Sequence, residues 1–220
     1  MRDSYVSQLK LLHGDLTEMG MMCEEAIASA IRALTENDDG LRKHVFAVDA
    51  GIDRKEREIE NLCLRLILRQ QPVASDLREI SSALKMVSDM ERIGDQASDI
   101  AEIAAYILGR SNRHEADLHS MAAETIRMVN ESIEAFIKRD LSLARKVIRD
   151  DVIVDDWFSR IRRELIGMIP ERGDGEYLVD LLMIAKYLER IADHATNIAE
   201  WVVYAITATH PKDHEPQPEE

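Results

Sequence analysis

The sequence predicts an all-α protein of six long helices, arranged as two tandem and similar three-helix bundles. Three observations favour this fold class. The 220 residues are 45% hydrophobic and 32% charged, enough to bury a core. Only nine glycines and five prolines interrupt a chain rich in helix-forming residues. The motif Glu91-Arg92-Ile93-Gly94-Asp95 returns as Glu189-Arg190-Ile191-Ala192-Asp193, 98 positions later (189 − 91). One helical unit is therefore used twice.

The first half contains three helical patterns. An amphipathic helix is expected over about residues 4–36, and the turn-forming run Asn37-Asp38-Asp39-Gly40 ends it. A second helix continues to about residue 70, where Pro72 breaks the pattern. Ser75 or Asp76 can cap a third helix that runs to Leu108. These segments make up a predicted first bundle over residues 1–110.

The second half repeats this order. Helices are expected over about residues 115–138 and 141–169, and the run from Pro170 to Gly175 separates them from a last helix that reaches about Thr207. The predicted second bundle covers residues 111–208. Residues 209–220 lack apolar periodicity, and we expect a disordered tail there.

Charge and cysteine content narrow the partners and the compartment. The 42 acidic against 28 basic residues give a net charge of −14, which repels nucleic acid. Cys23 and Cys63 have no CxxC spacing, which favours buried thiols in a reducing compartment such as the cytoplasm. The longest stretch without a formal charge, residues 201–211, is shorter than the roughly 18 to 20 apolar residues that cross a bilayer. Any membrane association should therefore be indirect, through partners.

Acidic residues gather on single faces of the predicted helices. At about 100° per residue, the acids of the third helix fall within an arc of about 80°, opposite an apolar face. They are Glu91, Asp95, Asp99 and Glu102, and their equivalents in the last helix are Glu189, Asp193, Asn197 and Glu200. The preceding helices carry Asp49 and Asp53, and Asp151 and Asp155, on one strip each. If these helices pack side by side at about 8 to 10 Å, two carboxylate rows border one groove in each half.

Facing rows of carboxylates repel each other, so something should offset the repulsion. Arg92 or Arg190 could form ion pairs across the bundle, which would leave the acids with a purely structural role. Alternatively, the carboxylates hold hard cations that prefer oxygen ligands, such as magnesium, calcium, manganese or iron. His194 would then add a nitrogen ligand in the second half. The spacing alone leaves both interpretations open.

No enzyme signature supports a catalytic role. The Glu-x-x-His pairs of a ferritin-like di-iron centre are absent, and Leu118 stands where a zinc-protease helix would need its second histidine. Gly-rich phosphate loops and nucleophile elbows are missing as well. A carboxylate-bridged metal oxidase or a metal-storage bundle stays as the alternative to a non-enzymatic protein.

The chain resembles a known family at this point. The run from Gln70 to Ile80, Gln-Gln-Pro-Val-Ala-Ser-Asp-Leu-Arg-Glu-Ile, together with the two acidic motifs, looks like the PhoU phosphate-signalling regulators. The resemblance extends over about residues 4–207. It implies a cytoplasmic, usually homodimeric, non-enzymatic adaptor with two similar three-helix bundles. Such proteins restrain the phosphate-starvation response by linking the ATPase subunit of the Pst phosphate importer to a sensor histidine kinase, commonly PhoR.

The resemblance also implies metal binding, because the acidic motif holds metal clusters in some members of the family. Carried over residue by residue, the predicted ligands are Glu91, Asp95, Glu189 and Asp193, with Asp49, Asp53, Asp151 and Asp155 on the facing helices. Outer candidates are Asp99, Asn197, Glu102, Glu200 and His194. The ion expected is divalent or ferric: Fe, Mg, Mn, Zn or Ca. The chain departs from the commonest family pattern at Gln96 and Asp99, and at Phe158 and Arg162.

Overall fold

The computed structural model of the chain describes residues 2–36, 38–107, 115–172 and 175–214, and it confirms the all-α prediction. Six long helices and one short 3-10 helix account for these residues, and no strand occurs among them. The elements are α1 (Arg2–Thr35), α2 (Asp39–Gln70), α3 (Ser75–Ile107), α4 (Glu115–Lys138), α5 (Leu141–Arg172), α6 (Gly175–Thr207) and η1 (Pro211–His214).

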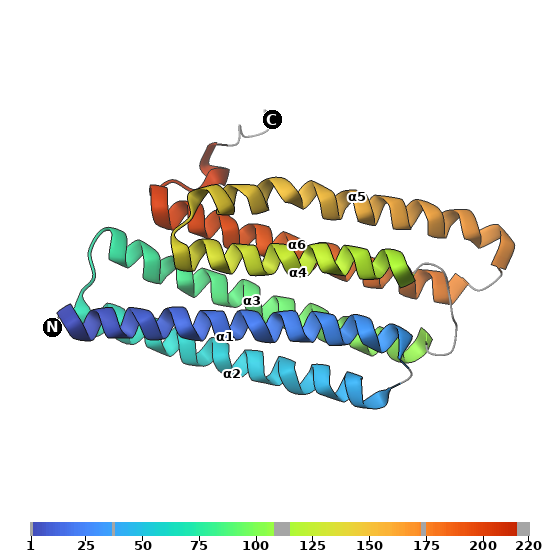
Figure 1. Cartoon of the computed structure of the whole chain (residues 1–220), viewed down its shortest axis with the longest axis horizontal. Helices are drawn as coiled ribbons and strands as arrows, with labels where there is room; N and C mark the ends of the chain where they lie inside the picture. The colour runs from blue at the N-terminus through green and yellow to red at the C-terminus, as the bar shows by residue number, and fades with distance from the viewer. Residues whose placement is uncertain (1, 37, 108–114, 173–174, 215–220) are drawn as a thin grey trace, which may run out of the picture.

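The helices form two three-helix bundles that lie side by side along one long axis (Figure 1). Within each bundle all three helices pack against one another. Between the bundles α3 packs on α6 and α1 packs on α4, whereas α2 and α5 contact only the helices of their own bundle. The described part of the chain therefore has an inner layer of four helices, with α2 and α5 on the outside.

The apolar faces predicted from the sequence form a continuous core. On α3 the side chains of Met86, Met90, Ile93 and Ile100 are fully buried. The equivalent positions of α6 are Ile184, Leu188, Ile191 and Ile198, which are also fully buried. Complete burial of such a side chain contributes about 1.5 to 3 kcal/mol. This burial fixes the rotation of α3 and α6 about their axes, and it turns their acidic faces toward α2 and α5.

Most helix ends follow the expected turn chemistry. Asp38 caps α2 through a hydrogen bond that Gly40 N donates to its Oδ1, at 2.7 Å. Asp140 caps α5 in the same way, with Leu143 N donating at 3.0 Å. Gln71 follows α2 in the left-handed region, with φ of 46°. Two side-chain caps and one left-handed residue thus mark three boundaries that the sequence predicts well.

Two boundaries differ from the prediction. The helix expected to stop at residue 169 continues through Pro170 to Arg172. A proline in the last turn removes one backbone donor, and the loss there is small enough for the helix to continue. The tail was predicted to be disordered from residue 209, yet residues 211–214 form η1. Residues 108 and 109, the predicted end of the third helix, lie outside the described residues.

Both cysteines are buried and free, as predicted. Burial raises the pKa of Cys23 and of Cys63 to about 12, so both thiols stay protonated at neutral pH. Across the described ranges, the helices all lack the combination of length and apolar character that spanning a bilayer requires.

Candidate metal-binding site

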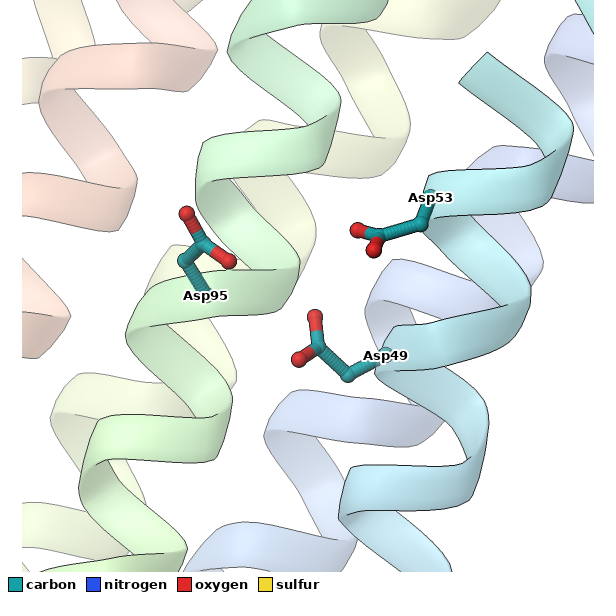
Figure 2. Close-up of side chains that lie close together, drawn as sticks. All are labelled: Asp49, Asp53 and Asp95. Carbon is teal, nitrogen blue, oxygen red and sulfur yellow. The ribbon is translucent and has the colours of Figure 1, made fainter. Parts of the chain in front are cut away.

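Three aspartates of the first bundle converge between α2 and α3. Asp49 and Asp53 lie one turn apart on α2, and Asp95 faces them from α3 (Figure 2). One carboxylate oxygen of each lies within 4.8 Å of the others. Asp49 and Asp53 are half-buried and Asp95 is exposed. We call Asp49, Asp53 and Asp95 the aspartate trio.

Gly94 makes room for this arrangement. A Cβ atom at this position would lie 2.7 Å from Asp49 Oδ1 and 3.0 Å from Ile52 Cδ1, closer than side-chain atoms pack. The Asp49 carboxylate therefore sits directly against the backbone of α3. Its Oδ1 is buried and accepts no hydrogen bond from the described residues. Burying a carboxylate oxygen without a hydrogen-bond partner costs free energy, and a bound cation would relieve that cost.

The electrostatics of the trio point the same way. Burial raises the pKa of Asp49, and the neighbouring carboxylates of Asp95 and Asp53 raise it further. The nearby Ser98 hydroxyl lowers this pKa in part. The side chain of Asp95 is exposed overall, but its carboxyl group is partly shielded from water, and this shielding raises its pKa. The Asp53 carboxylate raises the pKa further, and Arg92 lowers it. Raised carboxyl pKa values mean that the negative charges are insufficiently compensated. A bound cation would reverse that.

Glu91 lies beside the trio without being part of it. Its pKa is raised by burial first, then by the carboxylates of Asp95, Glu56 and Asp53. The carboxylates on both helices thus form one continuous negative field. Glu91 is half-buried, and its role as a metal ligand stays a prediction.

The outer candidates on α3 face the second bundle. Burial raises the pKa of Asp99, as do Asp95 and Glu102, whereas Arg190 and a hydrogen bond from Tyr187 lower it. Arg190 therefore partly offsets the acids of the other bundle, as one sequence interpretation expected. Glu102 is exposed.

The second bundle brings together the equivalent acids, and one of its own cations, Lys186, lies among them. The pKa of Asp193 rises to about 6, because of burial first and then the carboxylates of Glu189, Asp151 and Asp155, against Lys186. Lys186 forms an ion pair with Glu189. In the described part of the chain, these acids do not form a group of three within metal-ligand reach.

Two sequence differences and one hydrogen bond distinguish the bundles. Lys186 occupies the position equivalent to Ser88, and Ala192 the position equivalent to Gly94. Asp151 Oδ1 accepts a hydrogen bond of 3.1 Å from the Thr196 hydroxyl, whereas Asp49 Oδ1 has no such partner among the described residues. The second strip thus has more protein partners, although burial and the neighbouring carboxylates still raise the pKa of Asp151 and of Asp193.

The outer candidates of α6 have protein partners. Lys212 of η1 donates to Glu200 Oε2 at 2.7 Å and to Asn197 Oδ1 at 3.1 Å. His194 directs Nδ1 to Asp89 Oδ1 on α3, at 2.9 Å, and both side chains are buried between the bundles. A metal role for these three α6 residues stays a prediction.

The donor set of the trio fits a hard cation. Three carboxylates and no nitrogen or sulfur ligand match the preferences of Mg²⁺, Mn²⁺, Ca²⁺ and ferric iron better than those of Zn²⁺, which favours cysteine and histidine. The open side of Asp95 leaves room for water ligands. Residues from two helices would then share one ion.

Comparison with known proteins places this geometry in a family. The family model described as "PhoU domain" matches residues 16–104 and 118–202, one match in each bundle. The chain belongs to the PhoU family. It is 36% identical over 209 residues to the "Phosphate-specific transport system accessory protein PhoU homolog" of Clostridium acetobutylicum, with 94% of this chain and 95% of the relative covered.

Solved PhoU structures share the fold. The crystal structure of PhoU from Pseudomonas aeruginosa superposes with a TM-score of 0.87 at 36% identity, over 93% of this chain and 100% of that one. The phosphate transport system regulatory protein PhoU from Streptococcus pneumoniae gives a TM-score of 0.87 at 27% identity, over 94% and 98%. The resemblance stated from the motifs is therefore confirmed.

Sequence reasoning missed several contributors to this PhoU site. Gly94 was read as part of a repeated motif, although its replacement by Ala192 in the second copy already signalled a difference in space. Lys186 stands three residues before Glu189, a spacing that predicts the ion pair. Lys212 and Asp89 act across elements, and no local pattern reveals their partners.

Proposed function

We propose that the protein is a non-enzymatic cytoplasmic regulator of phosphate uptake and phosphate-starvation signalling. In this proposal it is an adaptor that connects the ATPase subunit of a Pst phosphate importer with a PhoR-like sensor histidine kinase, and it restrains the response when phosphate is abundant. The observation that carries the proposal is the PhoU match in both bundles, together with close relatives named as phosphate-specific transport accessory proteins. We propose a homodimer on the strength of the same resemblance.

We further propose that the aspartate trio binds a divalent or ferric ion. The support is the convergence of Asp49, Asp53 and Asp95, the orphaned Asp49 Oδ1 and the space left by Gly94. Asp49 and Asp53 belong to α2 and Asp95 to α3, so a shared ion would tie these helices together. A ligand present at 100 times its dissociation constant stabilises the folded state by about 2.7 kcal/mol. The ion would thus stiffen the outer helix of the first bundle, which is exposed to partners.

The regulatory role is tested by deletion and complementation in the source organism. Deleting the gene should switch on phosphate-starvation genes in phosphate-rich medium, and the wild-type gene should restore repression. Repression that survives the deletion would contradict the regulatory role. Purified protein mixed with the purified importer ATPase, and separately with the kinase cytoplasmic domain, tests the two proposed contacts by gel filtration.

The metal proposal has its own test. Wild-type protein and an Asp95→Ala, Asp193→Ala double variant are stripped with chelator, reloaded and analysed for bound metal. We expect less metal in the double variant, and single variants should assign the loss to Asp95. Equal metal content in all four proteins would remove the metal proposal and leave the regulatory one standing.

A metal oxidase or metal-storage protein is the alternative, favoured only by the converging carboxylates. Iron-loaded protein that consumes oxygen or peroxide over many turnovers would support the oxidase. Uptake of many iron ions per chain would support storage. The adaptor predicts neither, with about one ion bound at the trio.

A further inference from the structure

A pocket lies at the opposite end of the second bundle from its α5–α6 connection. Figure 1 shows the end of α6 beside the start of α5, with η1 above them. The pocket between these three elements has a volume of about 480 Å³. Cavities of about 300 to 1,000 Å³ are typical of small-ligand sites. None of the described residues that line the pocket is one of the predicted metal ligands.

Two exposed arginines line the pocket. Arg145 and Arg149 lie one turn apart on α5, so they share a face, and both are exposed. Neither forms an ion pair with any residue that the structure describes, although the chain carries 14 more negative than positive charges. Lys146, between them in sequence, pairs with Glu131 and Asp150. The two guanidinium groups are thus left available in a chain with many acids.

The repeat does not require these arginines. The positions 102 residues earlier, on the equivalent face of α2, hold Lys43 and Ala47. Lys43 forms an ion pair with Asp39, and Ala47 has no charge. At these positions the paired arginines therefore occur only in the second bundle, so the shared three-helix architecture does not account for them.

The remaining walls suit a small anion that carries an apolar part. Ile148 and Val203 provide apolar surface, and none of the described residues that line the pocket is a carboxylate. His210 stacks on Trp201 with ring centroids 4.7 Å apart. Lys212 N donates to His210 Nδ1 at 3.3 Å, which holds the ring at the edge of the pocket.

We propose that this pocket binds a phosphoryl group, either as free phosphate or on a small organic phosphate monoester. A guanidinium group offers parallel N–H donors that match phosphate oxygens, and two guanidinium groups balance a dianion. In a monoester, the organic part would rest on Ile148 and Val203. The proposal is independent of metal binding and goes beyond the adaptor role.

The test uses the full chain in a Trp157→Phe background, so that the fluorescence comes from Trp201. Inorganic phosphate and AMP are titrated separately at constant ionic strength, with EDTA present to keep metal out of the acidic strips. Phosphorus NMR line widths of the same ligands provide a second readout. We compare Arg145→Gln, Arg149→Gln with Arg65→Gln, Arg69→Gln, which removes two exposed arginines at the same spacing from α2.

We expect a saturable response in the parent and in the α2 control. In the pocket variant, the dissociation constant should rise at least about tenfold, because charge-assisted hydrogen bonds are the strong ones. Binding of both ligands would identify the free anion as sufficient, and binding of AMP alone would show that the organic part is needed. No response in either readout, or equal constants in pocket variant and control, would overturn the proposal. Circular dichroism verifies that all variants are folded.

Discussion

Replacing Gly94 with alanine should disable the aspartate trio while both bundles stay folded. The added Cβ would lie 2.7 Å from Asp49 Oδ1, and 3.0 Å and 3.3 Å from Ile52 Cδ1 and Cγ2. Ile52 is fully buried and cannot move far, so the Asp49 carboxylate has to rotate away from α3. The trio would then lose the carboxylate that lies deepest between the helices.

The expected magnitudes separate stability from binding. Alanine is better than glycine inside a helix by about 1 kcal/mol. Crowding in a packed core costs about 1 to 3 kcal/mol. The free energy of unfolding of the metal-free protein should therefore fall by no more than about 2 kcal/mol. Metal affinity should fall by about 10- to 100-fold, as it does when the surroundings of metal ligands are disturbed.

Isothermal titration of chelator-stripped protein with Mn²⁺ measures the affinity, and urea unfolding measures the stability. Ala192→Gly is the matched control, because it makes the reverse change at the equivalent position of the second bundle. It should cost about 1 kcal/mol and leave Mn²⁺ binding unchanged. If Gly94→Ala binds Mn²⁺ as tightly as the wild type, Asp49 is not a ligand and the argument from space is wrong.

Three further predictions concern charge. The folded-state pKa of Asp193, about 6, lies above its usual 3.8, so its burial costs stability above pH 6, and the cost disappears below pH 4. In EDTA at pH 7, Asp193→Asn should raise the free energy of unfolding by about 1 kcal/mol, after allowance for solvent screening. At pH 3.5 the substitution should change nothing. An equal effect at both pH values would contradict the prediction. Lys186→Ser, which copies Ser88, should add a second Mn²⁺ equivalent in titration, and unchanged stoichiometry would show that other features close the second strip. Arg139→Gln removes an ion pair of 2.6 Å with the buried Glu79, and it should lower the free energy of urea unfolding at pH 7 by about 1 kcal/mol. The contact between His13 and Glu79 would remain. A loss near zero would therefore mean that His13 alone compensates Glu79.

Much of the fold could be predicted because its signals are local or repeated. Apolar spacing located each helix, and turn residues such as Asp38 and Asp140 located most ends. The predicted end of α5 was wrong because proline removes only one backbone hydrogen bond near the end of a long helix. That loss did not stop the helix, which continues to Arg172. The η1 helix was missed because its contacts, such as Lys212 with Glu200, are made with a distant part of α6.

The candidate site could be predicted only in part. Spacing placed Asp49 and Asp53 on one face and Asp95 on another, but the distance between the faces depends on how α2 and α3 pack. The deciding contact is the approach of Asp49 to Gly94, which no pattern within one helix contains. His194 shows the same limit, because the sequence placed it beside Asp193, whereas its Nδ1 contact with Asp89 depends on how α6 packs on α3.

Few substitutions separate the acidic strip of the first bundle from that of the second. Gly94 admits the Asp49 carboxylate against α3, whereas the second bundle has Ala192 at the position of Gly94 and Lys186 at that of Ser88. Carboxyl pKa values are raised in both bundles, but among the described residues only Asp49, Asp53 and Asp95 of the first bundle converge within metal-ligand reach. A change in metal supply should therefore act on α2 and α3 far more than on α5 and α6. Because α3 packs directly on α6, any shift of α3 would reach the second bundle through that contact.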